Sequence, residues 1–176
     1  MSPWLVMAAI VPGVTATVIA LVAAMPWGLP DFAAFALPLV TLSVISFWSA
    51  RQPRLMPPAL VFALGVVTDL VTAGPIGYWA LLFLLAHFLA TLGPEVDSER
   101  GRWLLAWAYF AVTLPVVVVA GWLIASLYYL QTVAWQPLLL GTALALAASI
   151  LVNIVLQPVE RQVGRIMIRG RAEEAF

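Results

Sequence analysis

Two ionisable side chains, Asp69 and His87, lie within long apolar stretches of the sequence and are the first candidates for chemistry. A carboxylate and an imidazole on neighbouring helices could form a proton relay. A charge in the middle of a membrane-spanning helix costs about 2.5–3.5 kcal/mol, so a carboxylate there is expected to face other helices or water. The alternative for Asp69 is a structural role, in which it caps or hydrogen-bonds the helix ends at the turn that follows.

That turn has the sequence Gly74-Pro75-Ile76-Gly77, and it interrupts the apolar run. Glycine and proline are typical of turns, so we expect a tight reversal between two helices here. Asp69 lies about five residues before the turn and His87 about ten after it. At 1.5 Å of rise per residue the two side chains differ in depth by about 7–8 Å, which argues against a direct contact. We therefore expect His87 to be neutral and bonded to a neighbouring hydroxyl or carbonyl group.

Other catalytic groupings are scarce in the sequence. It has no cysteine and a single histidine, so we expect neither a disulfide framework nor a metal cluster. It has no lysine, which excludes a phosphate-binding loop that ends in lysine. The eight cationic residues are all arginines, too few and too close to the apolar runs for a nucleic-acid site. We expect a protein that is not an enzyme and needs no cofactor.

The composition predicts a membrane protein. Of the 176 residues, 64% are hydrophobic and 9% are charged, whereas soluble domains have about 25% charged residues. A membrane-spanning helix needs about 20 mostly apolar residues. We therefore predict an all-α integral membrane protein with six transmembrane helices, in which residues 1–158 form the bundle. The six apolar runs are residues 4–24, 32–50, 57–73, 76–92, 103–126 and 137–157.

The arginines fix the expected orientation. They lie in three places, residues 51–54, 100–102 and 161–171. With six spans all three places share one side of the membrane, and short cytoplasmic segments collect arginine and lysine. Both termini are therefore expected in the cytoplasm, with Asp69 near the outer end of its helix. Tryptophans that lie near span ends are expected to form an interfacial belt; they are Trp4, Trp27, Trp48, Trp79, Trp103 and Trp135.

The first apolar run has small residues at every fourth position, at Ala16, Ala20 and Ala24. Such a stripe lets another helix approach closely. The neighbour is either a helix of the same bundle or a helix of a partner protein, and we favour the same bundle.

The segment 159–176 is expected to be a cytoplasmic amphipathic tail. Arg161, Arg165 and Arg169 recur every four residues, so they share one face of a helix. Apolar residues, including Val159 and Val163, lie mainly on the other side. A helix of this kind is suited to lie on the anionic inner leaflet, with its arginines at the headgroups.

The link between the third and fourth runs has the pattern Gly65-x-x-x-Asp69-Leu70-x-x-x-Gly74-Pro75-x-Gly77. With this pattern, its length, six spans and cytoplasmic termini, the sequence resembles the family of the bacterial rod shape-determining protein MreD. The basic loop and prolines of residues 51–58 also fit. The resemblance covers the whole chain in hydropathy, but it is at the level of a motif only from about residue 57 to 92.

The resemblance implies a non-catalytic scaffold in the bacterial inner membrane that serves cell elongation and the maintenance of rod shape. Its partners would be MreC first, then the MreB assembly and the peptidoglycan glycosyltransferase and transpeptidase pair. Its fold would be similar to the substrate-binding S-components of energy-coupling-factor vitamin transporters. The residues of the motif, Gly65, Asp69, Gly74, Pro75 and Gly77, would be structural or partner-binding.

The main alternative is that the chain is itself such an S-component and docks a transporter through the alanine stripe of its first helix. A ligand pocket needs several convergent polar groups. The outer loops offer mainly Asp31, Gln131, Thr132 and Gln136. We therefore favour the scaffold over vitamin binding; a small intramembrane enzyme is a third alternative.

Overall fold

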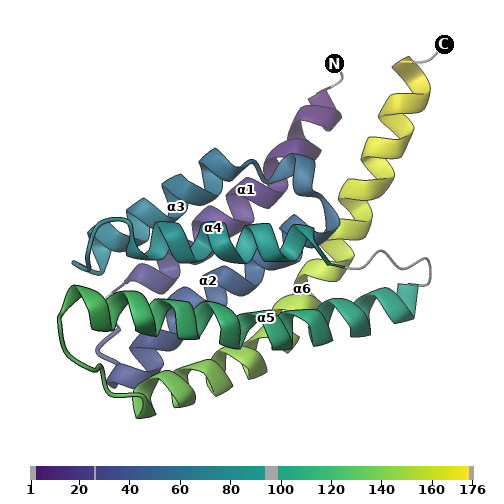
Figure 1. Cartoon of the computed structure of the whole chain (residues 1–176). Helices are drawn as coiled ribbons and strands as arrows, with labels where there is room; N and C mark the ends of the chain where they lie inside the picture. The colour runs from purple at the N-terminus through teal and green to yellow at the C-terminus, as the bar shows by residue number, and fades with distance from the viewer. Residues whose placement is uncertain (1–2, 26, 94–98, 175–176) are drawn as a thin grey trace.

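Figure 1 shows the computed structural model of the protein, which describes residues 3–25, 27–93 and 99–174. Within these residues the chain is all α-helical, with six α-helices and one short 3₁₀ helix. In chain order they are α1 (Pro3–Ala24), α2 (Asp31–Arg51), the 3₁₀ helix η1 (Pro53–Leu55), α3 (Pro58–Val71), α4 (Tyr78–Thr91), α5 (Glu99–Tyr128) and α6 (Gln136–Glu174).

In the part of the chain that the structure describes, two elements of the prediction are confirmed: the all-α class and the presence of six α-helices. Helices α1 to α4 begin and end within a few residues of the expected apolar runs. Two boundaries differ more. α5 begins at Glu99, and α6 continues to Glu174 instead of ending near Gln157. The described part of the expected tail is therefore not a separate helix but the continuation of α6.

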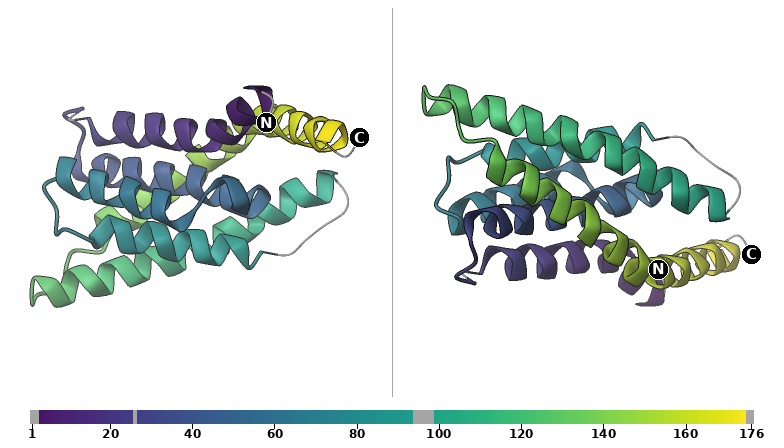
Figure 2. Two further views of the ribbon diagram at one scale, coloured as in Figure 1. Left: turned by 90° about the horizontal axis from the view of Figure 1, so that it is seen from above. Right: turned by 90° about the horizontal axis from the view of Figure 1, so that it is seen from below.

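A proline directly follows residue 157, where the sequence predicts the end of the last apolar run. Pro158 lies inside α6, and Figures 1 and 2 show that α6 bends in its second half. Proline removes one hydrogen bond and crowds the preceding turn, so it bends a helix but does not always end it. We call residues 159–168, which follow Pro158, the C-terminal arm.

Successive helices reverse direction, so their connections gather at two ends of the bundle (Figure 2). The α1–α2, α3–α4 and α5–α6 connections lie at one end, which we call the hairpin end. Both termini and the first residues of α3 and α5 lie at the other, which we call the termini end. This is the arrangement that six successive spans predict, and it places the basic η1 segment and the C-terminal arm at one end.

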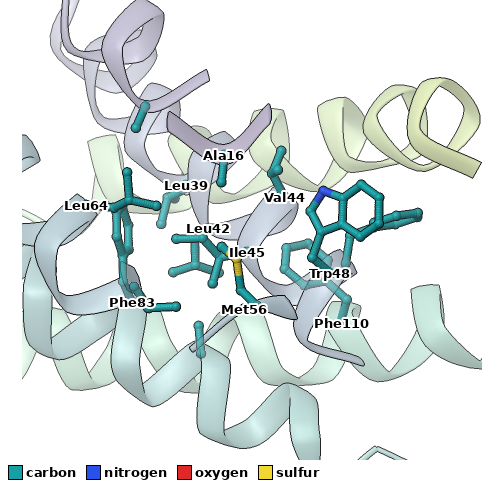
Figure 3. Packing of buried hydrophobic residues seen from close by; sticks show 14 of the residues in the cluster. Ala16, Leu39, Leu42, Val44, Ile45, Trp48, Met56, Leu64, Phe83 and Phe110 are labelled. Atoms are coloured by element: carbon teal, nitrogen blue, oxygen red, sulfur yellow. The ribbon is translucent and has the colours of Figure 1, made fainter. Parts of the chain in front are cut away.

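α2 is the central helix. Every residue from 41 to 49 is buried, and a helix that is buried on all sides must have neighbours all around it. α2 packs against α1, α4, α5 and α6. Figure 3 shows the resulting core, in which side chains of α2 meet those of the surrounding segments. Its labelled members are Ala16, Leu39, Leu42, Val44, Ile45, Trp48, Met56, Leu64, Phe83 and Phe110.

The outer surface is rich in large apolar side chains. Val112 on α5 and Leu151 and Val155 on α6 are between 64% and 68% exposed. By length and composition, two segments of α5 and α6 are able to cross a membrane, Trp107–Tyr128 and Gln136–Ile168. The other apolar helices are shorter: Ala8–Ala24, Phe35–Arg51, Pro58–Val71 and Tyr78–Thr91.

Candidate functional site

Asp69 joins α3 to the beginning of α4. It lies near the C-terminal end of α3 and is only 1% exposed. The backbone N–H of Gly77 donates to its Oδ2 at 2.8 Å, and the N–H of Trp79 donates to its Oδ1 at 2.8 Å. Gly77 directly precedes α4 and Trp79 is the second residue of that helix. The carboxylate therefore caps the N-terminus of a helix other than its own.

The cap meets a need of α4. The first N–H groups of an α-helix have no acceptor within the helix, and the residue at the N-cap position, Gly77, has no side chain to supply one. An anion is favoured at this end by the helix dipole, and hydrogen bonds to a charged acceptor are the stronger kind. Capping, the structural alternative for Asp69, is thus the interaction observed, and both carboxylate oxygens are engaged in it.

Gly65 lets the two helices approach closely enough for the cap to form. A Cβ atom at this position would lie 2.5 Å from the backbone nitrogen of Ala80 and 2.9 Å from the carbonyl carbon of Trp79. Both are backbone atoms of α4, which cannot move aside as a flexible side chain would. Since Gly65 lies one helical turn before Asp69, the spacing of four places the close contact and the cap on the same face of α3.

The turn residues have separate roles in the same hairpin. Gly77 has φ +97°, a left-handed conformation that glycine adopts without the steric cost of a Cβ. The N–H of Gly74 donates to the backbone carbonyl of Asp69 at 3.2 Å, and the N–H of Tyr78 donates to the carbonyl of Pro75 at 3.1 Å. All five residues of the predicted motif therefore lie in one small joint between α3 and α4.

His87 belongs to a different contact. It is 8% exposed, and its Nδ1 lies 2.7 Å from the hydroxyl oxygen of Ser49 on α2. The expected bond to a neighbouring hydroxyl group is confirmed. The hydrogen bonds of Asp69 go to the start of α4, so the structure does not bring the carboxylate and the imidazole together. Ser49 is fully buried. Its hydroxyl is therefore closed to solvent, and the pair is a contact between α2 and α4 inside the bundle.

The indole of Trp48 makes a hydrogen bond to α1 that the sequence does not predict. Its Nε1 donates to Thr15 Oγ1 on α1 at 3.0 Å, and the residue is fully buried. The expectation that Trp48 and Trp79 belong to an interfacial belt is wrong, because both lie inside the bundle. In contrast, Trp27 and Trp135 are more than half exposed. Closeness to the end of a span did not reveal which side of the helix each indole occupies.

Arg51, the last residue of α2, makes a third hydrogen bond between helices. Its Nη2 donates to Asn153 Oδ1 on α6 at 3.5 Å, and its guanidinium carbon lies 3.9 Å from the ring centre of Phe47. Asn153 in turn donates to the carbonyl of Ser149 within α6 at 2.8 Å. Together with the contacts of Trp48 and Ser49, this ties the last turns of α2 to α1, α4 and α6.

The alanine stripe of α1 faces the protein itself. Ala16 is fully buried and Ala20 is 2% exposed, and both belong to the hydrophobic core. Ala24, at the end of α1, is partly exposed. α1 packs against α2, α3 and α6. The favoured interpretation, a stripe that serves its own bundle, is confirmed for Ala16 and Ala20.

The C-terminal arm differs from the expected surface helix in what its apolar side contacts. Val163 is 3% exposed and belongs to the core, and Val159, Ile166 and Met167 pack against that core. The apolar side of the arm therefore contacts the protein core, whereas the sequence predicts that it contacts the inner leaflet. Arg161 and Arg165 are exposed; the side chain of Arg169 lies outside the described part of the structure.

Among the described residues, no three His, Cys, Asp or Glu side chains are grouped so that they could hold a metal ion.

The fold and the hairpin define an all-α bundle in which a buried carboxylate caps a neighbouring helix. Comparisons with protein-family models, with curated proteins and with solved structures found no match.

Proposed function

We propose that the protein is a non-catalytic inner-membrane scaffold of the machinery that elongates a rod-shaped bacterium, as its resemblance to the MreD family implies. In this role it would hold the membrane segments of MreC and of other elongation proteins: the MreB assembly and the peptidoglycan glycosyltransferase and transpeptidase pair. The helix faces and the rim of the α3–α4 hairpin would provide the contacts.

The observation that supports this proposal most is that the motif and the joint coincide. The motif is a spacing of residues in the sequence, and three of its residues have distinct physical roles in the structure. Gly65 permits the close approach of α4, Asp69 caps that helix, and Gly77 adopts the left-handed conformation at its start. A motif that builds a joint is what a scaffold needs.

A membrane location is supported by the surface and the charge distribution. Residues 103–159 contain no charged side chain, and they include most of the two helices that are long enough to span a bilayer. The described arginine side chains, Arg51, Arg54, Arg161 and Arg165, belong to the end of α2, to η1 and to the C-terminal arm, all at the termini end. This distribution favours cytoplasmic termini.

The state of the two candidate chemical groups favours a non-catalytic role. Both oxygens of Asp69 accept backbone hydrogen bonds, and Ser49, the partner of His87, is inaccessible to solvent. A general base must reach the substrate proton that it removes. Backbone N–H groups occupy both oxygens of Asp69, and the hydroxyl that His87 contacts is closed to a substrate by its burial.

The alternative, an S-component, would dock its transporter through the alanine stripe of α1. Ala16 and Ala20 lie in the core of this protein, so they do not present a docking face. This favours the scaffold over the transporter subunit.

Depletion in the rod-shaped bacterium that encodes the protein tests the proposal. We expect cells to widen and become round as the protein is lost, and to recover their width when the wild-type gene is restored. As a matched pair, Gly164→Ala should also restore the rod, because a Cβ there meets nothing within 4 Å, whereas Gly65→Ala should not. Unchanged cell width after depletion would reject the elongation role.

Co-purification from the same cells distinguishes the two alternatives. After extraction in a mild detergent, a tagged copy is expected to bring down MreC and the peptidoglycan synthases. Recovery of an ATPase module, or of a vitamin bound in equimolar amount by mass spectrometry, would establish the S-component instead.

A further inference from the structure

The last two residues of α5 and the connection to α6, together residues 127–135, expose large apolar and aromatic side chains at the hairpin end. Leu130 is 91% exposed, more than any other large apolar residue in the described part of the chain. Leu127 and Tyr128 are 73% and 64% exposed. Tyr129 and Trp135 are also more than half exposed. We call this segment the α5–α6 tip.

The exposure is not that of a frayed chain end, because hydrogen bonds tie the tip to α5. Trp122 Nε1 donates to the carbonyl of Val133 at 3.0 Å. The N–H of Val133 donates to Ser126 Oγ at 3.4 Å, and the N–H of Gln131 donates to the carbonyl of Ser126 at 3.2 Å. Several polar groups of the backbone are thus satisfied within the protein, which lowers the cost of placing the tip away from bulk water.

Leu130 is held in an unfavourable conformation. Its φ is +51°, a region that bulky residues rarely adopt. Residues kept in such conformations often have a reason in function. The residue in this conformation has the most exposed large apolar side chain of the described residues; in the chain it follows Tyr128 and Tyr129 and precedes Trp135.

We propose that the α5–α6 tip is an anchor for the outer leaflet, in which Leu130 enters the upper acyl region and the aromatic side chains lie among the headgroups. Tyrosine and tryptophan, each with an apolar ring and a polar group, are suited to this boundary. The lack of charge throughout residues 103–159 makes the tip continuous with the apolar surface of α5 and α6. This inference rests on the proposed membrane location.

Because the chain has no cysteine, single cysteines can report the depth of chosen sites. Leu130→Cys is labelled with a small fluorophore in the full-length protein, reconstituted in phosphatidylcholine and phosphatidylglycerol vesicles. Val112→Cys on α5, 68% exposed, is the lipid reference, and Arg54→Cys in η1, which is exposed, is the water reference. Quenching is measured with iodide on both sides, and with lipids spin-labelled near the headgroup or deep in the acyl chain.

We expect the label at Leu130 to be quenched several-fold more by the shallow spin label than by the deep one, and to be at least threefold less sensitive to iodide than the label at Arg54. Iodide quenching equal to that at Arg54 would overturn the anchor. Protection from iodide and from both lipid quenchers would overturn it too, since protein would then cover the tip. If the label at Val112 is also open to iodide, the membrane location itself fails, so the two failures can be told apart.

Discussion

Replacing Asp69 with alanine removes both acceptor oxygens from the joint between α3 and α4. The N–H groups of Gly77 and Trp79, each 2.8 Å from the carboxylate in the native protein, would then lose their partner. The site is 1% exposed, so water cannot replace the carboxylate without opening the joint. The rest of the hairpin, including the glycines that form its turn, is unchanged by this substitution.

The loss is expected to be large for a single substitution. A hydrogen bond to a charged group contributes about 1.5–3 kcal/mol, and a buried donor left without a partner costs about 1–3 kcal/mol. Two bonds at the lower value give about 3 kcal/mol, somewhat above the 0.5–2 kcal/mol that is typical of removing an N-cap. We expect the free energy of unfolding to fall by about 3 kcal/mol for Asp69→Ala and by about half as much for Asp69→Asn, which keeps one acceptor oxygen.

Thr72→Val is the matched control in the same turn. The Thr72 hydroxyl donates to the carbonyl of Thr68 at 2.8 Å, but that carbonyl also accepts the backbone N–H of Thr72. The residue is exposed, so the change is expected to stay within about 0.5 kcal/mol. Unfolding would be followed by far-ultraviolet circular dichroism as sodium dodecyl sulfate is added to mixed micelles. If Asp69→Ala and Thr72→Val unfold at the same point, the carboxylate does not stabilise the joint.

Three further changes test the packing of the same helices in the same unfolding assay. Gly65→Ala should cost at least about 2 kcal/mol, because α3 and α4 must separate to admit the Cβ atom. In the control Gly164→Ala the Cβ meets nothing within 4 Å, so this change should be neutral or stabilising by up to about 1 kcal/mol. Equal effects of the two substitutions would contradict the close contact at Gly65. Ser49→Ala should cost about 1–3 kcal/mol because it leaves the ring nitrogen of His87 without its partner. The double variant Ser49→Ala/His87→Leu should be more stable than Ser49→Ala alone, and additive losses would show that the pair does not interact. Trp48→Phe should cost about 1 kcal/mol through loss of the indole bond to the threonine hydroxyl of α1, and an unchanged unfolding midpoint would contradict that bond.

The lengths of the apolar runs and the turn chemistry were enough to predict the helices and the joint. Six apolar runs separated by proline, glycine or charge gave six helices, because each signal is local in the chain. The Gly-Pro-x-Gly turn likewise placed Asp69 close to the start of the next helix. Which N–H groups the carboxylate would reach could not be predicted, since that depends on how closely α3 and α4 approach, and the contact of Gly65 with α4 is a property of the packed pair.

The features that the sequence did not predict depend on contacts between helices. Trp48 was placed at a span end by counting, but the burial of α2 on every side turned its indole inward to α1. The sequence predicts that the last apolar run ends at residue 157, but the packing of Val163 against the core stabilises the helix beyond the bend. In both cases contacts between helices decided the outcome, and a local pattern does not contain them.

The positions of these contacts limit how α4 can move. Asp69 holds its first turn at the hairpin end, and Ser49 holds it through His87 in its second half. The α2 helix that supplies Ser49 is itself tied to α1 and α6 by Trp48 and Arg51. A transporter that alternates between two states needs elements that shift against one another, and the hydrogen bonds in both halves of α4 oppose such a shift. This arrangement suits a platform of fixed shape, so binding of a partner is expected to leave the α2–α3–α4 unit in place.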